Sequence, residues 1–212
     1  MQTQGKFITF EGGEGSGKST QVERLTSWLN TKGIAATTTR EPGGSSSAEA
    51  IRSLLVEGAI DRWQPISEVL LHNAARAEHI SNLVSPALGR GDWVISDRYA
   101  DSTMAYQGYA HGFDQKVIQR IHNEVVGDVL PDLTLILDIP VPTGLDRAGQ
   151  RQDNEDRYER MGLDFHERVR HGFLEIAKQN PTRCVVVDAQ QTVDKVSDAI
   201  IATVAGRLDV DL

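Results

Sequence analysis

The nine residues from Gly12 to Thr20 constrain the fold of this chain more than any other part of its 212-residue sequence. They read Gly-Gly-Glu-Gly-Ser-Gly-Lys-Ser-Thr and fit the pattern Gly-x-x-x-x-Gly-Lys-Ser/Thr. An apolar run at residues 7–10 precedes them, and apolar residues at helical spacing follow as far as residue 32. The segment therefore predicts a strand, a glycine-rich turn and a helix, which together begin an α/β fold.

This turn has the chemistry of a phosphate site. Glycines allow successive backbone N–H groups to point at one anion, and the N-terminus of the following helix adds partial positive charge. In a loop of this pattern Lys18 reaches the β- and γ-phosphates, and the Ser19 hydroxyl is the expected Mg²⁺ ligand. We therefore expect a nucleoside triphosphate to bind at Gly12, Gly13, Glu14, Gly15, Ser16, Gly17, Lys18, Ser19 and Thr20.

The rest of the chain alternates between strand-like and helical patterns. Further strands are expected at residues 35–39, 93–96, 133–137 and 184–187, and further helices at 48–56, 65–88, 114–126, 142–149, 160–178 and 192–208. The alternation predicts a three-layer α/β fold of the P-loop NTPase type, with a five-stranded parallel sheet and helices on both faces. We expect one domain over residues 1–212, with a short polar lid at about 148–160.

The overall charge limits the possible partners. Twenty-two basic and 30 acidic residues give a net charge of −8, which argues against binding to a nucleic acid polymer. No apolar run approaches the ~18 residues of a membrane helix, so we expect no membrane association. The single cysteine, Cys184, and the absence of a recognisable secretory segment favour a cytoplasmic location. Any anionic ligand must then be held by a local group of cations.

Arginines at the expected strand ends suggest a phosphorylated acceptor. Arg40 follows the second strand and Arg98 the third, so both should face the crevice at the carboxyl edge of the sheet. Arg76 lies in a helix, and Arg147, Arg151, Arg157 and Arg160 flank the polar segment. Guanidinium groups clamp phosphates bidentately, and a phosphate acceptor needs no general base because its second pKa is ~6. The chain has no Asn-Lys pair, which argues against a guanine-reading GTPase.

Four stretches of sequence resemble the bacterial thymidylate kinases, which are nucleoside monophosphate kinases. They are Glu11–Ser19, Thr39–Gly44, Asp97–Gly108 and Leu130–Asp138, and the resemblance extends from about Phe7 to Leu208. It implies Mg²⁺-dependent phosphoryl transfer from ATP to dTMP, giving dTDP and ADP for dTTP synthesis. A kinase of another nucleoside monophosphate or of a nucleoside is the alternative. A nucleotide-binding switch without transferase activity is a further one.

The resemblance also implies roles for residues on the acceptor side. Glu14 would contact the 3′-hydroxyl of the deoxyribose, while Arg98 and Arg40 would hold the 5′-phosphate of dTMP. Tyr106 would occupy the space of a ribose 2′-hydroxyl. The thymine base would be bound by Arg76, Ser102, Gln107 and His72, where His72 stands in place of a phenylalanine that usually stacks on the base.

On the donor side, Asp97 would act on Mg²⁺ together with Ser19, and Arg147 would stack on adenine. The loop has Gly15 where some family members have an arginine, so the catalytic arginine should come from the lid. Arg151 is the preferred residue and Arg157 the alternative. The implied catalytic residues are Lys18, Asp97, Arg98 and Arg151. The family commonly forms homodimers through long helices, and the apolar stripe on residues 66–88 would suit either a dimer interface or a core.

Overall fold

The computed structural model describes residues 5–127, 129–150 and 156–211. These residues contain a five-stranded parallel sheet with the strand order β2-β3-β1-β4-β5. The strands are β1 (Phe7–Glu11), β2 (Ala36–Arg40), β3 (Trp93–Asp97), β4 (Leu133–Asp138) and β5 (Cys184–Asp188). The predicted five strands and the fold class are confirmed.

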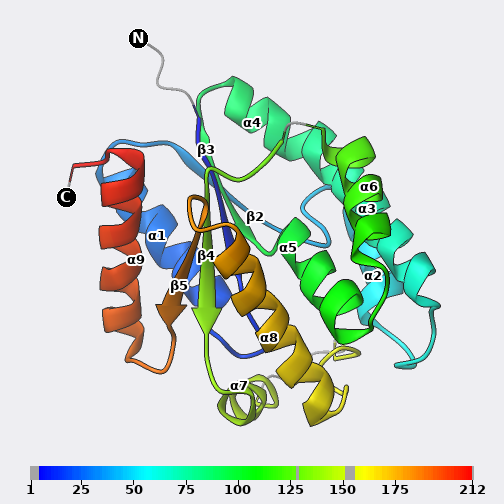
Figure 1. Cartoon of the computed structure of the whole chain (residues 1–212). Coiled ribbons are helices and arrows are strands. Elements are labelled where there is room, and N and C mark those ends of the chain that lie inside the picture. Colours follow the sequence, from blue (N-terminus) through cyan, green and yellow to red (C-terminus); the bar gives the residue numbers. More distant parts are fainter. Residues whose placement is uncertain (1–4, 128, 151–155, 212) are drawn as a thin grey trace.

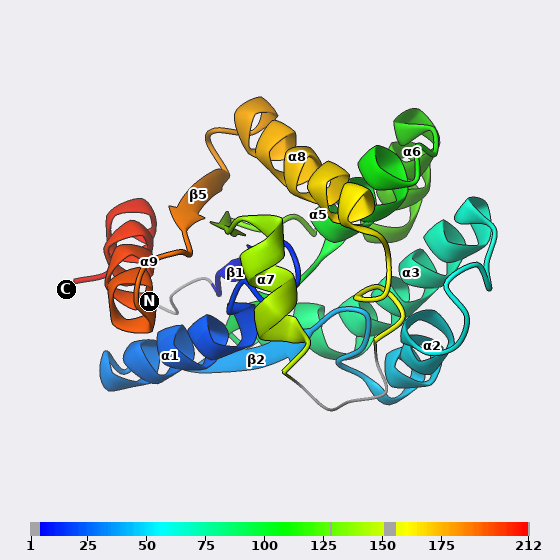
Figure 2. The ribbon, with the colours of Figure 1, turned by 90° about the horizontal axis from the view of Figure 1, so that it is seen from below.

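Helices cover both faces of this sheet, as predicted (Figures 1 and 2). One face carries α1 (Lys18–Thr31) and α9 (Val193–Leu208), and α8 (Leu163–Gln179) packs on β4 and β5 from the other. The remaining helical elements are α2 (Ser46–Val56), α3 (Pro65–His79), η1 (Ile80–Val84), α4 (Ser85–Gly89), α5 (Ala100–Thr103), η2 (Met104–Ala110), α6 (Gln115–Val126) and α7 (Val141–Ala148).

Alternate residues of the central strands point into separate cores. Ile8 and Phe10 of β1 pack with the apolar faces of α1 and α9. Phe7 of the same strand packs instead with Tyr99 and the helical segment around Val84. Because the strands are covered on both faces, their sequences are almost continuously apolar, and this is why the runs were recognisable.

The long helix expected at 65–88 is interrupted by a π turn. The N–H of Ser85 bonds to the carbonyl of Ile80, five residues earlier, and η1 therefore separates α3 from α4. Pro86 follows directly and has no N–H to donate, so the regular bonding pattern cannot pass through it. The single helix expected at 65–88 is thus divided by a widened turn just before Pro86.

Residues 100–110 form a helical segment that the sequence pattern did not predict. Most residues of η2 are buried, including the polar Gln107, so no amphipathic period marks the segment. Its neighbour α8 approaches closely at Gly172, where an added Cβ would lie 2.8 Å from the Cβ of Tyr109. Within the described ranges, no helix is long and apolar enough to span a bilayer.

Candidate active site

A cavity of about 670 Å³ opens at the carboxyl ends of the strands, the edge seen in Figure 2. Its volume lies within the range of small-molecule sites. Most of the residues predicted from the sequence line it: Glu14, Gly15, Ser16, Gly17, Lys18, Ser19, Thr20, Arg40, His72, Arg76, Asp97, Arg98, Ser102, Tyr106, Gln107 and Arg147. Arg151 lies outside the described residues.

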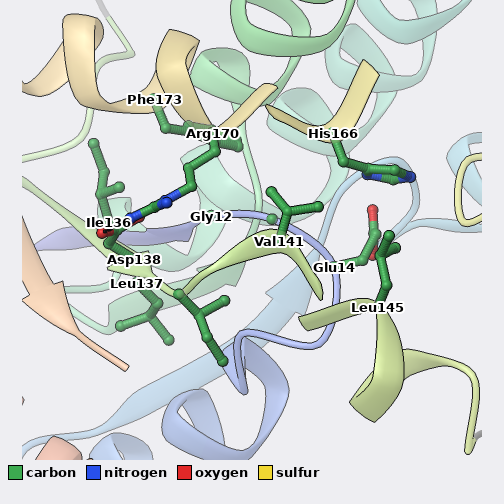
Figure 3. A pocket seen from close by; sticks show the side chains of 12 residues that line it. Gly12, Glu14, Ile136, Leu137, Asp138, Val141, Leu145, His166, Arg170 and Phe173 are labelled. Atoms are coloured by element: carbon green, nitrogen blue, oxygen red, sulfur yellow. Dashed lines mark hydrogen bonds and ion pairs between the residues drawn. The ribbon is translucent and has the colours of Figure 1, made fainter. Parts of the chain in front are cut away.

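The glycine-rich loop connects β1 to α1, and its shape depends on glycine. Gly12 and Gly15 have φ values of 135° and 65°, which side chains of L residues rarely adopt. A Cβ on Gly12 would collide with the carbonyl of Leu137, and one on Gly15 with the carbonyl of Gly144 in α7. Gly12 and Gly13 line a second, smaller pocket behind the loop, bordered by α7 and α8 (Figure 3).

Lys18 and Ser19 stand at the start of α1, where the predicted phosphate chemistry requires them. The Lys18 ammonium is buried and donates to the carbonyls of Gly12 (3.1 Å) and Gly13 (2.9 Å). Burial and the nearby Arg98 lower the Lys18 pKa to about 8. The Ser19 hydroxyl donates to Asp97 Oδ2 over 2.6 Å. The Ser19 hydroxyl and the Asp97 carboxylate are oxygen ligands of the kind that Mg²⁺ prefers, and Mg²⁺ commonly takes only one or two protein ligands beside water and phosphate.

Arg98 occupies a strained position directly after β3. Its φ of 69° is unusual for a residue other than glycine and directs the side chain into the cavity. The guanidinium donates to Gly12 O (3.1 Å), Ser102 Oγ (3.1 Å) and Glu14 Oε1 (2.9 Å). Burial opposes ionisation of Glu14, but Arg98 and Lys18 outweigh it and lower the Glu14 pKa to about 2. The Tyr106 hydroxyl also donates to Glu14, over 2.6 Å. We call Glu14, Lys18, Ser19, Asp97 and Arg98 the loop cluster.

A second group of polar side chains comes from α3, η2 and the segment after the undescribed residues 151–155. His72 Nε2 lies 3.1 Å from the hydroxyl of Tyr158. Burial and the neighbouring arginines, Arg76 first among them, lower the His72 pKa to about 3, so its imidazole is neutral near pH 7. We call Glu68, His72, Arg76, Gln107 and Tyr158 the helix cluster.

Arg76 is almost fully buried, with 2% of its surface exposed. Its Nε donates to Glu41 Oε2 (2.8 Å) and its terminal nitrogens to Asn73 and Thr103. The other oxygen of Glu41 meets His79 at 2.8 Å. Arg76 is therefore part of a buried charge network as well as a lining residue of the cavity.

Glu68 is the centre of a second buried network. One of its oxygens accepts from the Arg157 guanidinium and the other from Gln107 Nε2, over 2.9 Å. Arg157 is fully buried and also donates to the carbonyls of Leu55 (3.1 Å), Ala59 (2.9 Å) and Ile60 (2.8 Å). It does not line the cavity. The interpretation of Arg157 as an alternative catalytic residue is therefore disfavoured, because its N–H groups are already bonded to Glu68 and to backbone carbonyls away from the cavity.

The remaining predicted residues also have partners. Arg40 pairs in register with Asp97 across the sheet, and its side chain forms an ion pair with Glu49 (2.9 Å). Arg147 donates weakly to the carbonyl of Ala189 (3.4 Å). Ser102 donates through its hydroxyl to Glu11 over 2.5 Å.

Several polar residues of the site, both charged and neutral, were missed by the sequence interpretation. Arg52, Glu41, Tyr158, Gln150 and Glu159 all line the cavity. Glu11 lies beneath it, fully buried at the end of β1, and burial together with Asp101 raises its pKa to about 8. Glu11 and Glu41 each lie at a strand end, a signal that could have indicated them; Arg52 and Tyr158 carry no comparable signal.

The geometry agrees with comparisons to known proteins. The family model described as thymidylate kinase matches residues 10–200. A thymidylate kinase of Caulobacter vibrioides is 52% identical over 206 residues, covering 97% of this chain and 99% of that protein. One from Magnetococcus marinus is 47% identical over 207 residues, covering 98% and 99%. The crystal structure of thymidylate kinase from Ehrlichia chaffeensis superposes with a TM-score of 0.75 at 36% identity, covering 94% of this chain and 98% of that one. A glycine-rich loop, strand-end arginines and these matches together place the chain in the thymidylate kinase family.

Proposed function

We propose that this chain transfers the γ-phosphoryl group of ATP to dTMP, giving ADP and dTDP. It is then a transferase of the nucleoside monophosphate kinase class. The observation that carries the proposal is one cavity shared by a triphosphate-type loop and five arginines from other segments: Arg40, Arg52, Arg76, Arg98 and Arg147. Two polyanions can approach each other only where cations neutralise their repulsion.

On the donor side, the loop backbone and Lys18 bind the β- and γ-phosphates. When ATP binds, Lys18 exchanges the carbonyls of Gly12 and Gly13 for phosphate oxygens. The negative phosphates raise the lowered pKa of Lys18, so its amine is fully protonated in the complex. Ser19 and Asp97 would hold Mg²⁺, which would supply positive charge against the phosphates. Arg147 lines the cavity at the end of α7, where its guanidinium plane suits an adenine face.

On the acceptor side, Arg98 and Arg40 bind the 5′-phosphate of dTMP. Glu14 remains ionised because its pKa is about 2, so its oxygens accept hydrogen bonds from a sugar hydroxyl as well as from Tyr106. The base contacts are assigned to Arg76, His72, Ser102 and Gln107. Neutral His72 offers a ring face for stacking without adding charge.

The catalytic arginine is assigned to Arg151, within a lid at about residues 148–160 of a single 1–212 domain. Two observations support this assignment: the loop has Gly15 and no arginine, and Arg157 donates to Glu68 and to three backbone carbonyls. We expect Arg151→Ala to lower kcat more than it raises the KM for dTMP. An unchanged kcat in steady-state assays of this variant would move the assignment to another residue.

A homodimer is also proposed. Ile66 and Leu70, on the outer side of α3, are 37% and 52% exposed, whereas Val69 between them is buried. Light scattering on the purified protein measures the mass directly. A mass of about 23.3 kDa at micromolar concentration would exclude the dimer.

The decisive experiment is an ADP-release assay with Mg²⁺ and ATP over a panel of acceptors. We expect dTMP to be the best substrate among dTMP, dUMP, dCMP, AMP and thymidine. A better rate with thymidine or another monophosphate would indicate a different kinase. ATP binding without any acceptor-dependent ADP release would indicate a nucleotide-binding protein without transferase activity.

A further inference from the structure

His79 is completely buried at the end of α3 and does not line the cavity, yet both of its ring nitrogens have a polar partner. Nδ1 lies 2.8 Å from Glu41 Oε1, and Nε2 lies 2.7 Å from the Thr39 hydroxyl. An ionised carboxylate only accepts hydrogen bonds, so Nδ1 carries the hydrogen of the first contact. The ring is therefore a directed donor to Glu41 as well as a part of the packed interior.

The turn after β2 keeps this ring in place. Gly44 packs so closely that an added Cβ would lie 2.6 Å from His79 Cδ2 and 2.4 Å from Thr39 Oγ1. The backbone N–H of Gly44 is bonded in turn to the Glu49 carboxylate over 2.9 Å. The His79 ring therefore cannot swing away from Glu41 unless the whole turn moves.

The other oxygen of Glu41 holds the guanidinium of Arg76. Of the five N–H groups of a guanidinium, three donate here: to Glu41 Oε2 (2.8 Å), to Asn73 (3.3 Å) and to Thr103 (2.9 Å). One N–H remains on each terminal nitrogen of Arg76, which lines the cavity. Because Glu41 fixes the guanidinium plane at Nε, the orientation of its carboxylate determines where these two N–H groups point.

We propose that His79 is a positioning residue for the acceptor site, because its hydrogen bond fixes Glu41 and thereby the two remaining N–H groups of Arg76. The proposal rests on the proposed function, in which Arg76 binds dTMP. Without the Nδ1 donor, Glu41 Oε1 would be a buried acceptor with no partner, which is costly. The carboxylate would then turn and accept a second N–H of Arg76, as side-on pairs do, and that N–H would be lost to the substrate.

Two substitutions at His79 separate the roles of its nitrogens. In His79→Asn the amide nitrogen takes the place of Nδ1 and can still donate to Glu41. In His79→Gln the amide lies at the position of Nε2, so the contact with Thr39 is kept and the donor to Glu41 is lost. We expect KM for dTMP to rise about tenfold in His79→Gln and less than threefold in His79→Asn. In both variants KM for ATP should stay within twofold and kcat within threefold.

Two further variants separate positioning from general damage. His122→Gln makes the same substitution at a buried histidine of α6 that has no hydrogen bond to Glu41 or Arg76 within the described residues, and should leave KM for dTMP unchanged. Thr39→Val removes the hydroxyl on the far side of the ring and should raise KM no more than twofold, because Glu41 keeps its donor. Equal rises in His79→Asn and His79→Gln, or a parallel rise in KM for ATP, would overturn the proposal.

A measurement on the unaltered protein covers the case in which the His79 variants do not fold. We expect ¹⁵N NMR to show a hydrogen on Nδ1 of His79, and addition of dTMP to shift the terminal nitrogens of Arg76. A ring protonated at Nε2 alone, or Arg76 signals that dTMP does not move, would overturn the proposal. If the unaltered protein leaves dTMP unphosphorylated, the proposed function fails, whereas turnover of dTMP with the same KM in both His79 variants defeats this inference alone.

Discussion

The loop cluster and the helix cluster face the same cavity but are built differently. The loop cluster has its geometry from nine consecutive residues and two strand ends, and its shape depends on backbone conformation. The helix cluster draws its side chains from segments up to 90 residues apart, joined by buried ion pairs such as Glu68–Arg157 and Glu41–Arg76. The loop cluster should therefore tolerate loss of a side chain structurally, whereas the helix cluster should not.

The largest expected effect tests the structural role of the helix cluster. Arg76→Met leaves the buried Glu41 without its arginine partner, so we expect the free energy of unfolding to fall by about 3–5 kcal/mol. Urea denaturation near pH 7 measures this change. The control is Arg90→Met, which breaks the exposed Arg90–Asp92 pair and should cost less than about 1 kcal/mol. Equal losses in the two variants would remove the contrast between the clusters.

A loss of chemistry without a loss of fold is expected for the loop cluster. Lys18→Ala removes a cation whose hydrogen bonds go to the Gly12 and Gly13 carbonyls and the Ser16 hydroxyl, all within the loop. We expect kcat to fall about 10²–10³-fold, while the free energy of unfolding changes by about 1 kcal/mol or less. Steady-state kinetics and urea denaturation of the same preparation distinguish a loss of catalysis from a loss of folding stability. Unfolding of the variant would show that Lys18 is structural.

ATP affinity should depend on pH through Lys18. Its pKa is about 8 without ligand, and bound phosphates raise it, so binding takes up a proton above pH 8. We expect Kd for ATP to rise by up to tenfold per pH unit above 8, and calorimetry in two buffers to show the uptake. Lys18→Arg stays charged and should abolish this dependence. A Kd that is flat from pH 7 to 9.5 in the unaltered protein would contradict the assigned pKa.

The smallest expected effect sharpens the description of His72. Its pKa is about 3 when folded and near 6.5 when unfolded, so the unfolded chain binds the additional proton between these values. The stabilisation is complete above pH 6.5 and declines as the pH falls. Between pH 7 and 5, His72→Phe should lose about 2 kcal/mol less stability than the unaltered protein. His171→Phe, at an exposed histidine, is the matched control; an identical decline in both variants would refute the assignment.

The same contrast explains how much of the molecule the sequence predicts. The five strands and the phosphate loop depend on local patterns, which are apolar runs and glycine positions, and they were found. Residues 100–110 were missed because burial of η2 removes the amphipathic period. Glu68 and Tyr158 were missed because their partners lie 89 and 86 residues away, and no local pattern records such a pairing. Arg157 was interpreted as a lid cation because its partner, Glu68, is 89 residues away in the sequence and no local pattern indicates the ion pair.

The contact between the glycine-rich loop and α7 limits which residues either segment can carry. A Cβ on Gly15 would meet the carbonyl of Gly144, and one on Gly144 would meet the carbonyl of Glu14, so neither position can acquire a side chain while the opposing backbone stays in place. An arginine at residue 15 is excluded because even its Cβ would collide with the carbonyl of Gly144. Any guanidinium that meets the transferred group in this chain has to be delivered from another segment. A variant with a cation at residue 15 would therefore have to move α7 aside.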